Sequence, residues 1–521
     1  MKKITNKILN NLPIVVLLIF CGIMSFQMCF SPFAQGHGHG YDSAIYAAIG
    51  NALNNGRVLY TGIVDNKGPL LYFIDALGLS INYHFGIFLI ECIFLFVGIV
   101  FAYKTAKLIT KNKKWLSCFS AIFATLLLVY TLDGGNYTEE YAIFFINIAT
   151  YFVIKFLLNE YKLAWYELLI IGMCFAATFL LRANLCAFFV SQVLVILVCL
   201  IKGKKFKVLF RSMGYILLGI LIFLTPFLIY LIKNGALSDC LNLVYFGVVN
   251  SFEQVSWLEK FTKMCGLIEI ADAAKIFSVA LLAFILFLTR PKMEKSIKRI
   301  MIIAFMGLLL NLYVNSLTGG EAWAFTHYFI SFIPIIVIIS AYFFNYIYES
   351  IKELKISNEI KNIIIILLAF TVIAPQTLDL LETSIKRIEF TYPEPSAMEQ
   401  YILDNSTEKD TIQIIGVNDA IYYPVNRIST SKHLYFAENF SERKRKSDAN
   451  ELVNDLYKAE NPAKIIMLPS GEIDKLTFTM SLENRDKFIG YLNKNYTLDV
   501  KASEQFNCNV YLLNNTSDLY E

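Results

Sequence analysis

The chain has 521 residues, of which 56% are hydrophobic and only 17% are charged, and its formal net charge is +4. Soluble domains carry charge on about a quarter of their residues, so this composition excludes an ordinary soluble protein and indicates a polytopic membrane protein. No P-loop or dinucleotide fingerprint is present in the sequence, so nothing supports a nucleotide-driven mechanism.

Apolar runs long enough to cross a bilayer, about 20 residues each, recur from the N-terminus to residue 382. They predict an α-helical membrane protein with about eleven transmembrane helices, at roughly 12–30, 84–103, 115–132, 140–158, 164–181, 184–201, 212–232, 272–289, 300–316, 327–347 and 362–380. The run 12–30 is too long for a signal-peptide core and lacks a small-residue cleavage site, so we expect a retained anchor. The apolar segment 69–82 carries Asp75 and is short for a span, which favours an interfacial or re-entrant helix.

Lysine and arginine clusters lie at alternate ends of these spans. They fall at 2–7, 104–114, 202–211, 290–299 and 352–361. The positive-inside rule assigns such clusters to the cytoplasm, which predicts a multi-pass protein of the cell membrane with its N-terminus inside and its C-terminal tail outside. Because topology explains the basic clusters, they indicate no nucleic-acid partner.

The composition becomes polar and charged after about residue 383. Helical patterns near 396–405, 448–459 and 483–494 alternate with strand-like runs at 411–416, 464–469, 496–500 and 509–514. We therefore predict a membrane domain over 1–382 and a small extracytoplasmic α/β domain over 383–521. No nucleophile–base pair is visible in the second part, so we expect it to recognise an acceptor or to pack against the outer loops.

The predicted topology collects polar residues at the outer face. Asp42 follows the first span and precedes a helix-like run, which leads to the turn Asp65-Asn66-Lys67-Gly68-Pro69. The pair Glu139 and Glu140, then Arg182, and then His327 follow at the outer ends of later spans. Polar residues gathered at one face suit chemistry on a lipid-linked phosphate better than passage through a pore.

Four motifs carry a family resemblance: YDSAIY (41–46), LYTGIVDNKGPLLYFIDALG (59–78), GGNYTEEYAIFF (134–145) and FLLRAN (179–184). Together they resemble the bacterial polyisoprenyl-phosphate-dependent glycosyltransferases of the GT-C class, akin to protein O-mannosyltransferases and to the aminoarabinose transferase of lipid A. The resemblance covers roughly residues 1–350. It implies a cell-envelope enzyme in the lipid bilayer, which moves a sugar from a polyprenyl-phosphate donor to a glycan, lipid or protein acceptor.

The resemblance also implies roles for individual residues. Asp42 is the candidate general base that activates the acceptor hydroxyl, with inversion at the anomeric carbon; such help typically contributes about 10²–10⁴-fold. Lys67 matches the family lysine placed against the donor phosphate, and Arg182 is the candidate second cation. Cations fixed near a departing phosphate stabilise its developing charge. Tyr41 and His327 are candidates for lining the cavity.

A divalent metal is a further implication of the resemblance. One of Glu139 and Glu140 matches an acidic position that helps to hold a metal in relatives, and we favour Glu140. With Asp42 and Asp65 it forms a candidate ligand set, for which oxygen ligands favour Mg²⁺ or Mn²⁺ and an added histidine favours Zn²⁺. Ser43 and Asn66 stand where many relatives have acidic residues, which leaves metal dependence open.

Each candidate also has a structural interpretation. Asp42 suits the N-cap of a helix over 43–55, Lys67 suits a snorkelling surface charge, and Arg182 suits a headgroup anchor. The two glutamates suit the N-terminal dipole of a helix. At the level of function, the alternative is a transporter or flippase of lipid-linked sugar, which would place polar residues near the bilayer midplane on broken helices.

Overall fold

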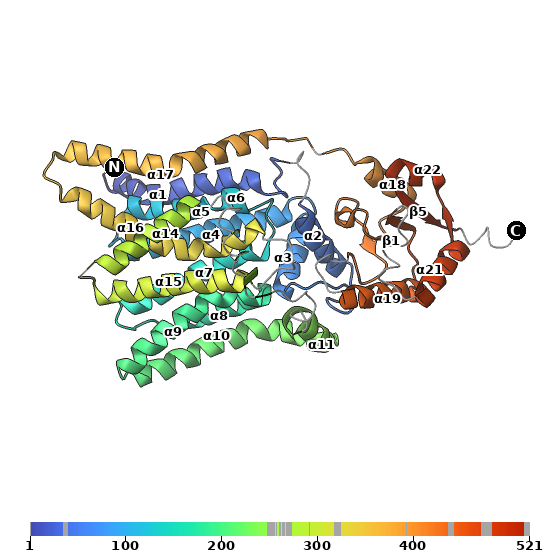
Figure 1. Ribbon diagram of the computed structural model, residues 1–521, viewed down its shortest axis with the longest axis horizontal. Coiled ribbons are helices and arrows are strands. Elements are labelled where there is room, and N and C mark those ends of the chain that lie inside the picture. Colours follow the sequence, from blue (N-terminus) through green and yellow to red (C-terminus); the bar gives the residue numbers. More distant parts are fainter. Residues whose placement is uncertain are drawn as a thin grey trace.

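The computed structural model describes residues 2–34, 40–246, 274–290, 292–316, 325–391, 393–435, 442–469 and 482–514, with a few single positions between 256 and 266. Long helices form a bundle from residues 2–386, and a small sheet with its own helices follows at one end of the bundle (Figure 1).

Eight helices of the described residues are long and apolar enough to cross a membrane. They are α4 (Gly86–Ile109), the run of α5 (Lys114–Thr125) and α6 (Leu128–Thr131), α7 (Thr138–Leu158), the run of η3 (Ala183–Cys186) and α9 (Ala187–Lys202), α10 (Phe206–Lys233), α15 (Lys295–Ser316), the run of η5 (Thr326–Phe332) and α16 (Ile333–Lys352), and α17 (Asn358–Lys386). Shorter apolar helices are α1 (Lys2–Met24) with η1 (Ser25–Gln27), α3 (Pro69–Ile81), α8 (Trp165–Leu181) and α14 (Ala274–Thr289). The expected spans therefore coincide with helices, and the chain is a multi-pass membrane protein.

The environment of each helix follows from its place in the bundle. Helix α16 is largely enclosed by its neighbours, whereas α10 and α17 lie along opposite edges of the bundle (Figure 1). Apolar side chains such as Leu221 of α10 and Ile366 of α17 are 58% and 66% exposed in the isolated chain. Because exposed apolar stripes on spanning helices suit lipid rather than water, these two helices are expected to face the bilayer.

Helix α2 (Tyr41–Asn54) and helix α3 lie at the end of the bundle nearest the sheet (Figure 1). They pack on each other, and α2 buries small residues such as Ala44 and Ala48. Helix α3 coincides with the segment 69–82, which was predicted to be too short to span the membrane. Pro69 occupies the first position of the helix. There the missing N–H of proline costs nothing, because the first amides of a helix have no intrahelical acceptor.

The C-terminal sheet has the strand order β2-β1-β3-β5-β4. Its strands are β1 (Thr411–Ile414), β2 (Ile428–Ser429), β3 (Ile465–Pro469), β4 (Tyr496–Leu498) and β5 (Cys508–Leu513), and its helices are α18 (Ala397–Asn405), η6 (Asp419–Tyr422), α19 (Glu442–Lys458), α21 (Leu482–Asn495) and α22 (Val500–Phe506). β1 pairs in parallel with β2 and β3, whereas β5 runs antiparallel to β3 and β4. The four predicted strands and three predicted helices are present, and α17 continues to Lys386, past the predicted domain boundary at residue 382.

The two faces of this sheet pack against different layers. Ile466 and Leu468 of β3 share a small core with Leu452 of α19 and Leu492 of α21. On the other face, residues such as Ile412 belong to a hydrophobic core that continues into the helical bundle. Alternation along the strands sends successive side chains to opposite faces, so one short sheet serves both cores.

Candidate functional site

The segments that carry the predicted site residues meet at the end of the bundle nearest the sheet. The Gly68 N–H donates to the Leu181 carbonyl at 3.0 Å, which joins the turn before α3 to the end of α8. The Ser43 hydroxyl donates to the Gly135 carbonyl at 2.7 Å, which joins the first turn of α2 to the loop before α7. The first bond lies next to Lys67 and Arg182, and the second lies next to Asp42. The two bonds thus join two pairs of segments that are distant in sequence.

Gly68 allows an unusually close approach of two backbones. A Cβ atom at this position would lie 2.0 Å from the Leu180 carbonyl oxygen, a distance that no side chain can adopt. Only glycine therefore lets the turn before α3 rest directly on the last turn of α8. This contact fixes where Lys67, the preceding residue, lies relative to the end of α8.

Tyr46 lies between the predicted base and the predicted phosphate ligand. Its hydroxyl donates to Asp42 Oδ2 at 3.4 Å, and Lys67 Nζ lies 5.5 Å from the centre of its ring. Asp42 and Lys67 are both half-buried, so each retains contact with solvent. The structure thus brings Asp42 and Lys67 to one aromatic side chain. Tyr46 was not predicted to belong to the site. Its position could have indicated it, because residues four apart on a helix lie on the same face and Tyr46 follows Asp42 by four residues.

The start of α2 rules out one interpretation of Asp42. The helix begins at Tyr41, its N-cap is Gly40, and no side chain caps it. Asp42 is therefore not the N-cap of a helix starting at residue 43, as the structural interpretation required. It lies inside the first turn, where the positive end of the helix dipole favours a carboxylate.

Asp65 is a buried carboxylate with three hydrogen-bond donors. The Asn66 N–H donates to Oδ1 at 2.6 Å, the Tyr435 hydroxyl donates to the same oxygen at 2.7 Å, and the Tyr72 hydroxyl donates to Oδ2 at 2.5 Å. Lys67 Nζ in turn donates to Asn66 Oδ1 at 2.7 Å. Asp65 therefore organises the turn that presents Lys67.

Arg182 pairs with Glu139 beside two aromatic rings. Its Nη1 donates to Glu139 Oε1 at 2.6 Å, and its guanidinium lies 4.9 Å from the centre of the Tyr328 ring. The Arg182 side chain is 20% exposed and the Glu139 side chain is 2% exposed. His327, the neighbour of Tyr328, stacks on the Tyr137 ring with 4.4 Å between ring centres. His327 thus lies next to the ion pair.

Glu140 has different surroundings from Glu139. Its Oε2 accepts the Asn136 N–H at 2.8 Å, and Oε1 of Glu91 accepts the same N–H at 2.7 Å. The Asn136 amide also donates to Asp75 Oδ2 at 3.2 Å. Neighbours on a helix point about 100° apart, which explains why adjacent glutamates reach separate clusters. The geometry therefore favours Glu139 over Glu140 as the acid beside the cationic site.

The carboxylates predicted as metal ligands do not converge among the described residues. Within that part of the chain, the group with ligand atoms within 4.8 Å of one another is His433, Asp448 and Glu451 in the C-terminal part. There the His433 hydrogen bond and the ion pair with Lys432 lower the pKa of the Glu451 carboxyl to about 2. In this arrangement the set Asp42, Asp65 and Glu140 does not fit a single metal ion.

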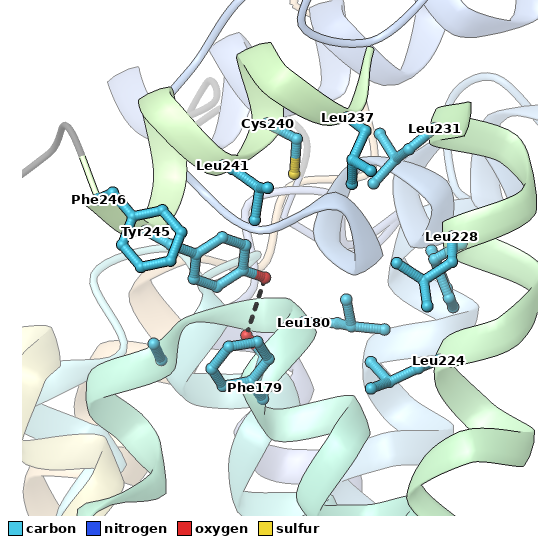
Figure 2. Close-up of a pocket in the computed structure, with 12 residues that line it drawn as sticks. Phe179, Leu180, Leu224, Leu228, Leu231, Leu237, Cys240, Leu241, Tyr245 and Phe246 are labelled. Atoms are coloured by element: carbon cyan, nitrogen blue, oxygen red, sulfur yellow. Dashed lines mark hydrogen bonds between the residues drawn. The ribbon is translucent and has the colours of Figure 1, made fainter. Parts of the chain in front are cut away.

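An apolar pocket of about 360 Å³ lies between the end of α8, helix α10 and residues 237–246. Figure 2 shows leucines of α10 facing the end of α8 and the segment α11 (Leu237–Cys240) with η4 (Leu241–Phe246) across it. The Tyr245 ring stacks on Phe179 with 4.8 Å between centres, and its hydroxyl donates to the Phe179 carbonyl at 3.4 Å (Figure 2). Leu180 and Ala183, which flank the Leu181–Arg182 step, both line the pocket. Arg182 itself is not among the residues that line the pocket, and its guanidinium lies on Glu139 and Tyr328.

The C-terminal part contributes to the same region. Besides the Tyr435 contact with Asp65, the Tyr41 hydroxyl donates to Asp419 Oδ2 at 2.9 Å. Burial raises the pKa of the Asp419 carboxyl to about 6, although the Tyr41 hydroxyl and the Gly416 N–H lower it in part. Tyr41, predicted to line the cavity, is 52% exposed and its hydroxyl contacts the C-terminal part.

Comparison with known proteins places the chain in a family. A family model described as "Putative competence-induced protein Ccs4 N-terminal domain" matches residues 2–354. The chain belongs to this family. The match ends before α17 and the C-terminal sheet. No curated protein matches the sequence.

Solved structures resemble this chain along most of its length. ArnT from Cupriavidus metallidurans in the apo state has a TM-score of 0.58 and 12% identity, over 95% of this chain and 97% of ArnT. The same enzyme bound to undecaprenyl phosphate has a TM-score of 0.57 and 10% identity, over 96% and 97% of the two chains. An Archaeoglobus fulgidus oligosaccharyltransferase in the apo form has a TM-score of 0.48 and 12% identity, over 93% and 73%. The likeness to the two ArnT structures shows that this member of the Ccs4 family has the GT-C glycosyltransferase fold.

Proposed function

We propose that the chain is a membrane glycosyltransferase that moves a sugar from a polyprenyl-phosphate donor to a glycan, lipid or protein acceptor at the outer face of the cytoplasmic membrane. The observation that carries the proposal is the meeting of Asp42 and Lys67 on the Tyr46 ring. A carboxylate and an ammonium group that contact the same tyrosine side chain match the two needs of the reaction, a base for the acceptor and a cation for the leaving phosphate.

In the proposed reaction, the acceptor hydroxyl oxygen attacks the anomeric carbon of the donor sugar. Asp42 takes the hydroxyl proton as the new carbon–oxygen bond forms. The bond between the anomeric carbon and the phosphate oxygen breaks on the opposite face, so the configuration inverts and polyprenyl phosphate leaves with the electron pair. Lys67 and Arg182 stabilise the charge that develops on that phosphate.

The apolar pocket supports a lipid-linked donor. Its lining of leucine, phenylalanine and alanine side chains suits a hydrocarbon chain, and it reaches the residue that follows Arg182. We propose that the polyprenyl chain of the donor occupies this pocket. The ArnT structure bound to undecaprenyl phosphate supports the same class of donor.

A transporter or flippase of lipid-linked sugar is the alternative. Such proteins place their polar groups near the bilayer midplane on discontinuous helices. The gathering of Asp42, Lys67 and Arg182 at one end of the bundle favours the transferase, because it concentrates reactive groups at the membrane surface, where an acceptor can reach them.

The test uses the full chain in nanodiscs and undecaprenyl phosphates that carry labelled glucose, galactose, mannose or a pentose. Release of undecaprenyl phosphate with transfer of the label to an acceptor is the expected result for wild type. Asp42→Asn should lower the rate about 10²–10⁴-fold, the usual worth of a general base. Glu160→Gln, at an exposed acid outside the site, should leave it unchanged.

Two outcomes count against the proposal. Full activity of Asp42→Asn would remove Asp42 as the base. In proteoliposomes, movement of the labelled donor across the membrane without cleavage of its sugar–phosphate bond would establish the transporter instead.

A further inference from the structure

The C-terminal part holds the turn that carries Lys67 through one short segment, residues 429–435, which we call the strap. The Arg57 guanidinium donates to the Ser429 carbonyl at 2.8 Å, and the Val64 N–H donates to the Lys432 carbonyl at 3.0 Å. The Tyr435 hydroxyl at the end of the strap donates to Asp65 Oδ1 at 2.7 Å. The strap therefore runs along residues 57–65, and its last residue contacts the buried carboxylate of Asp65.

The strap is fixed to its own sheet by side chains. The Ser431 N–H donates to Gln413 Oε1 at 2.9 Å, and the Gln413 amide donates to the His433 carbonyl at 3.0 Å. The Ser431 hydroxyl donates to Asp455 Oδ2 of α19 at 2.8 Å. These groups are bound to β1 and α19, so the position of Tyr435 is set by the folded C-terminal part.

Asp65 is linked to Lys67 through Asn66. Its three donors leave the carboxylate one orientation, in which Oδ1 accepts both the Tyr435 hydroxyl and the Asn66 N–H. Asn66 Oδ1 then accepts from Lys67 Nζ at 2.7 Å, while the Tyr60 hydroxyl donates to the Lys67 carbonyl at 2.8 Å. Hydrogen bonds to a charged group are stronger than hydrogen bonds between neutral groups. The bonds to the Asp65 carboxylate are therefore the strongest in the series of contacts from Tyr435 to Lys67.

We propose that Tyr435 is a positioning residue for the phosphate-binding lysine, so that the C-terminal part is a component of the donor site. The inference rests on the proposed function, because it assigns Lys67 to a phosphate. It predicts that the hydroxyl of one tyrosine, far from Lys67 in sequence, controls affinity for the phosphate of the lipid and not for its hydrocarbon chain.

The test compares Tyr435→Phe with Tyr423→Phe in the full chain. Tyr423 makes a matched contact from the same C-terminal part, because its hydroxyl donates to the Tyr83 carbonyl at 2.9 Å, away from Asp65. Dissociation constants are measured in nanodiscs for undecaprenyl phosphate and for undecaprenol. Tyr435→Phe should weaken undecaprenyl phosphate binding about tenfold, the worth of one hydrogen bond to a charged group, and leave undecaprenol binding unchanged. Tyr423→Phe should change neither.

A second measurement separates positioning from general loss of structure. In an Asp65→Ala background, which lacks both carboxylate oxygens, Tyr435→Phe should have no additional effect on undecaprenyl phosphate affinity, because the link is already broken. Hydrogen exchange of the peptide over 60–68 should accelerate in Tyr435→Phe and not in Tyr423→Phe.

Three results would overturn the inference: equal effects of the two tyrosine variants, equal loss of undecaprenol binding, or additive effects with Asp65→Ala. Failure of the proposed function is recognised separately, because wild type itself would then neither bind undecaprenyl phosphate nor transfer sugar, and the inference would fall with it.

Discussion

The Arg182 guanidinium donates a 2.6 Å hydrogen bond to a Glu139 carboxylate that is almost wholly buried. An ion pair in such surroundings is costly to break, because the remaining charge loses its partner without regaining water. Arg182→Met should therefore destabilise the protein by about 3 kcal/mol, whereas Arg182→Met combined with Glu139→Gln should recover most of that loss. Thermal unfolding followed by size-exclusion chromatography in detergent measures both effects.

Lys386 and Glu382 on α17 provide the control for this prediction. They form an exposed pair with side chains that are 70% and 64% exposed. Lys386→Met should change stability by less than about 1 kcal/mol, as exposed pairs do. An equal loss in the double variant and in Arg182→Met would show that the two charges do not compensate each other.

Lys67→Met should reduce kcat/KM for a polyprenyl-phosphate sugar on the order of 10²–10³-fold, the usual cost of removing one fixed donor to a developing negative charge. Steady-state transfer in nanodiscs is the measurement. Lys104, whose ammonium lies over the Phe101 ring within α4, is the matched lysine, and Lys104→Met should retain wild-type kinetics. Unchanged transfer by Lys67→Met would leave Lys67 as a surface charge.

Gly68→Ala should disturb both stability and transfer, because the added methyl group has no space against the Leu180 carbonyl. Overpacking of this kind costs about 1–3 kcal/mol and would move Lys67 away from the end of α8. Gly214 of α10 is the control, since a Cβ there meets nothing within 4 Å. Gly214→Ala should be neutral or slightly stabilising, as alanine is the better helix former. Similar effects of both changes would argue against the close contact.

The Asp419 carboxyl predicts a pH dependence of stability. Its pKa rises from 3.8 to about 6 in the folded protein. The folded state therefore holds this proton more tightly than the unfolded state, so stability is greatest below pH 4 for this group and falls as pH rises to about 6. The fall amounts to about 2–3 kcal/mol. Asp419→Asn should remove it from the pH profile of thermal unfolding.

Asp410 supplies the contrasting acid for that experiment. The Thr407 N–H lowers its pKa, so its titration lies below the window of Asp419. Asp410→Asn should leave the fall between pH 4 and about 6 intact, and a fall that survives in Asp419→Asn would assign it to another group.

Filling the apolar pocket should weaken binding of the lipid chain. Leu228 lines the pocket and is 40% exposed, whereas its neighbour Ile229 is 48% exposed and does not line it. Leu228→Trp should raise the dissociation constants of undecaprenyl phosphate and undecaprenol alike, by about tenfold, and Ile229→Trp should leave both unchanged. An effect on the phosphate alone would place the lipid chain elsewhere.

The fold was largely predictable because a bilayer imposes its thickness on the sequence. Each expected span coincides with a helix, including the shorter α8 and α14. In the C-terminal part, four strands (β1, β3, β4 and β5) and three helices (α18, α19 and α21) also follow from their sequence patterns, whereas β2, η6 and α22 were not predicted. The order of the strands did not follow, since β5 is inserted between β3 and β4 by contacts that no local pattern encodes.

The site was predictable only one segment at a time. Motifs indicated Asp42, Lys67 and Arg182, but nothing in the sequence of adjacent glutamates separates Glu139 from Glu140. Their difference arises from the rotation between neighbours on a helix and from what lies opposite each face. Tyr435 lies hundreds of residues from Asp65, in a part of the chain with no visible catalytic pattern, so its contact required the tertiary structure.

The family match covers residues 2–354, whereas the hydroxyl that holds Asp65 belongs to residue 435. A gene fragment cut at the end of the family domain would encode Asp42, Lys67 and Arg182 and still lack one donor to the carboxylate behind the lysine. Loss of activity in such a truncated protein would therefore not distinguish a wrong assignment of these residues from the loss of that donor.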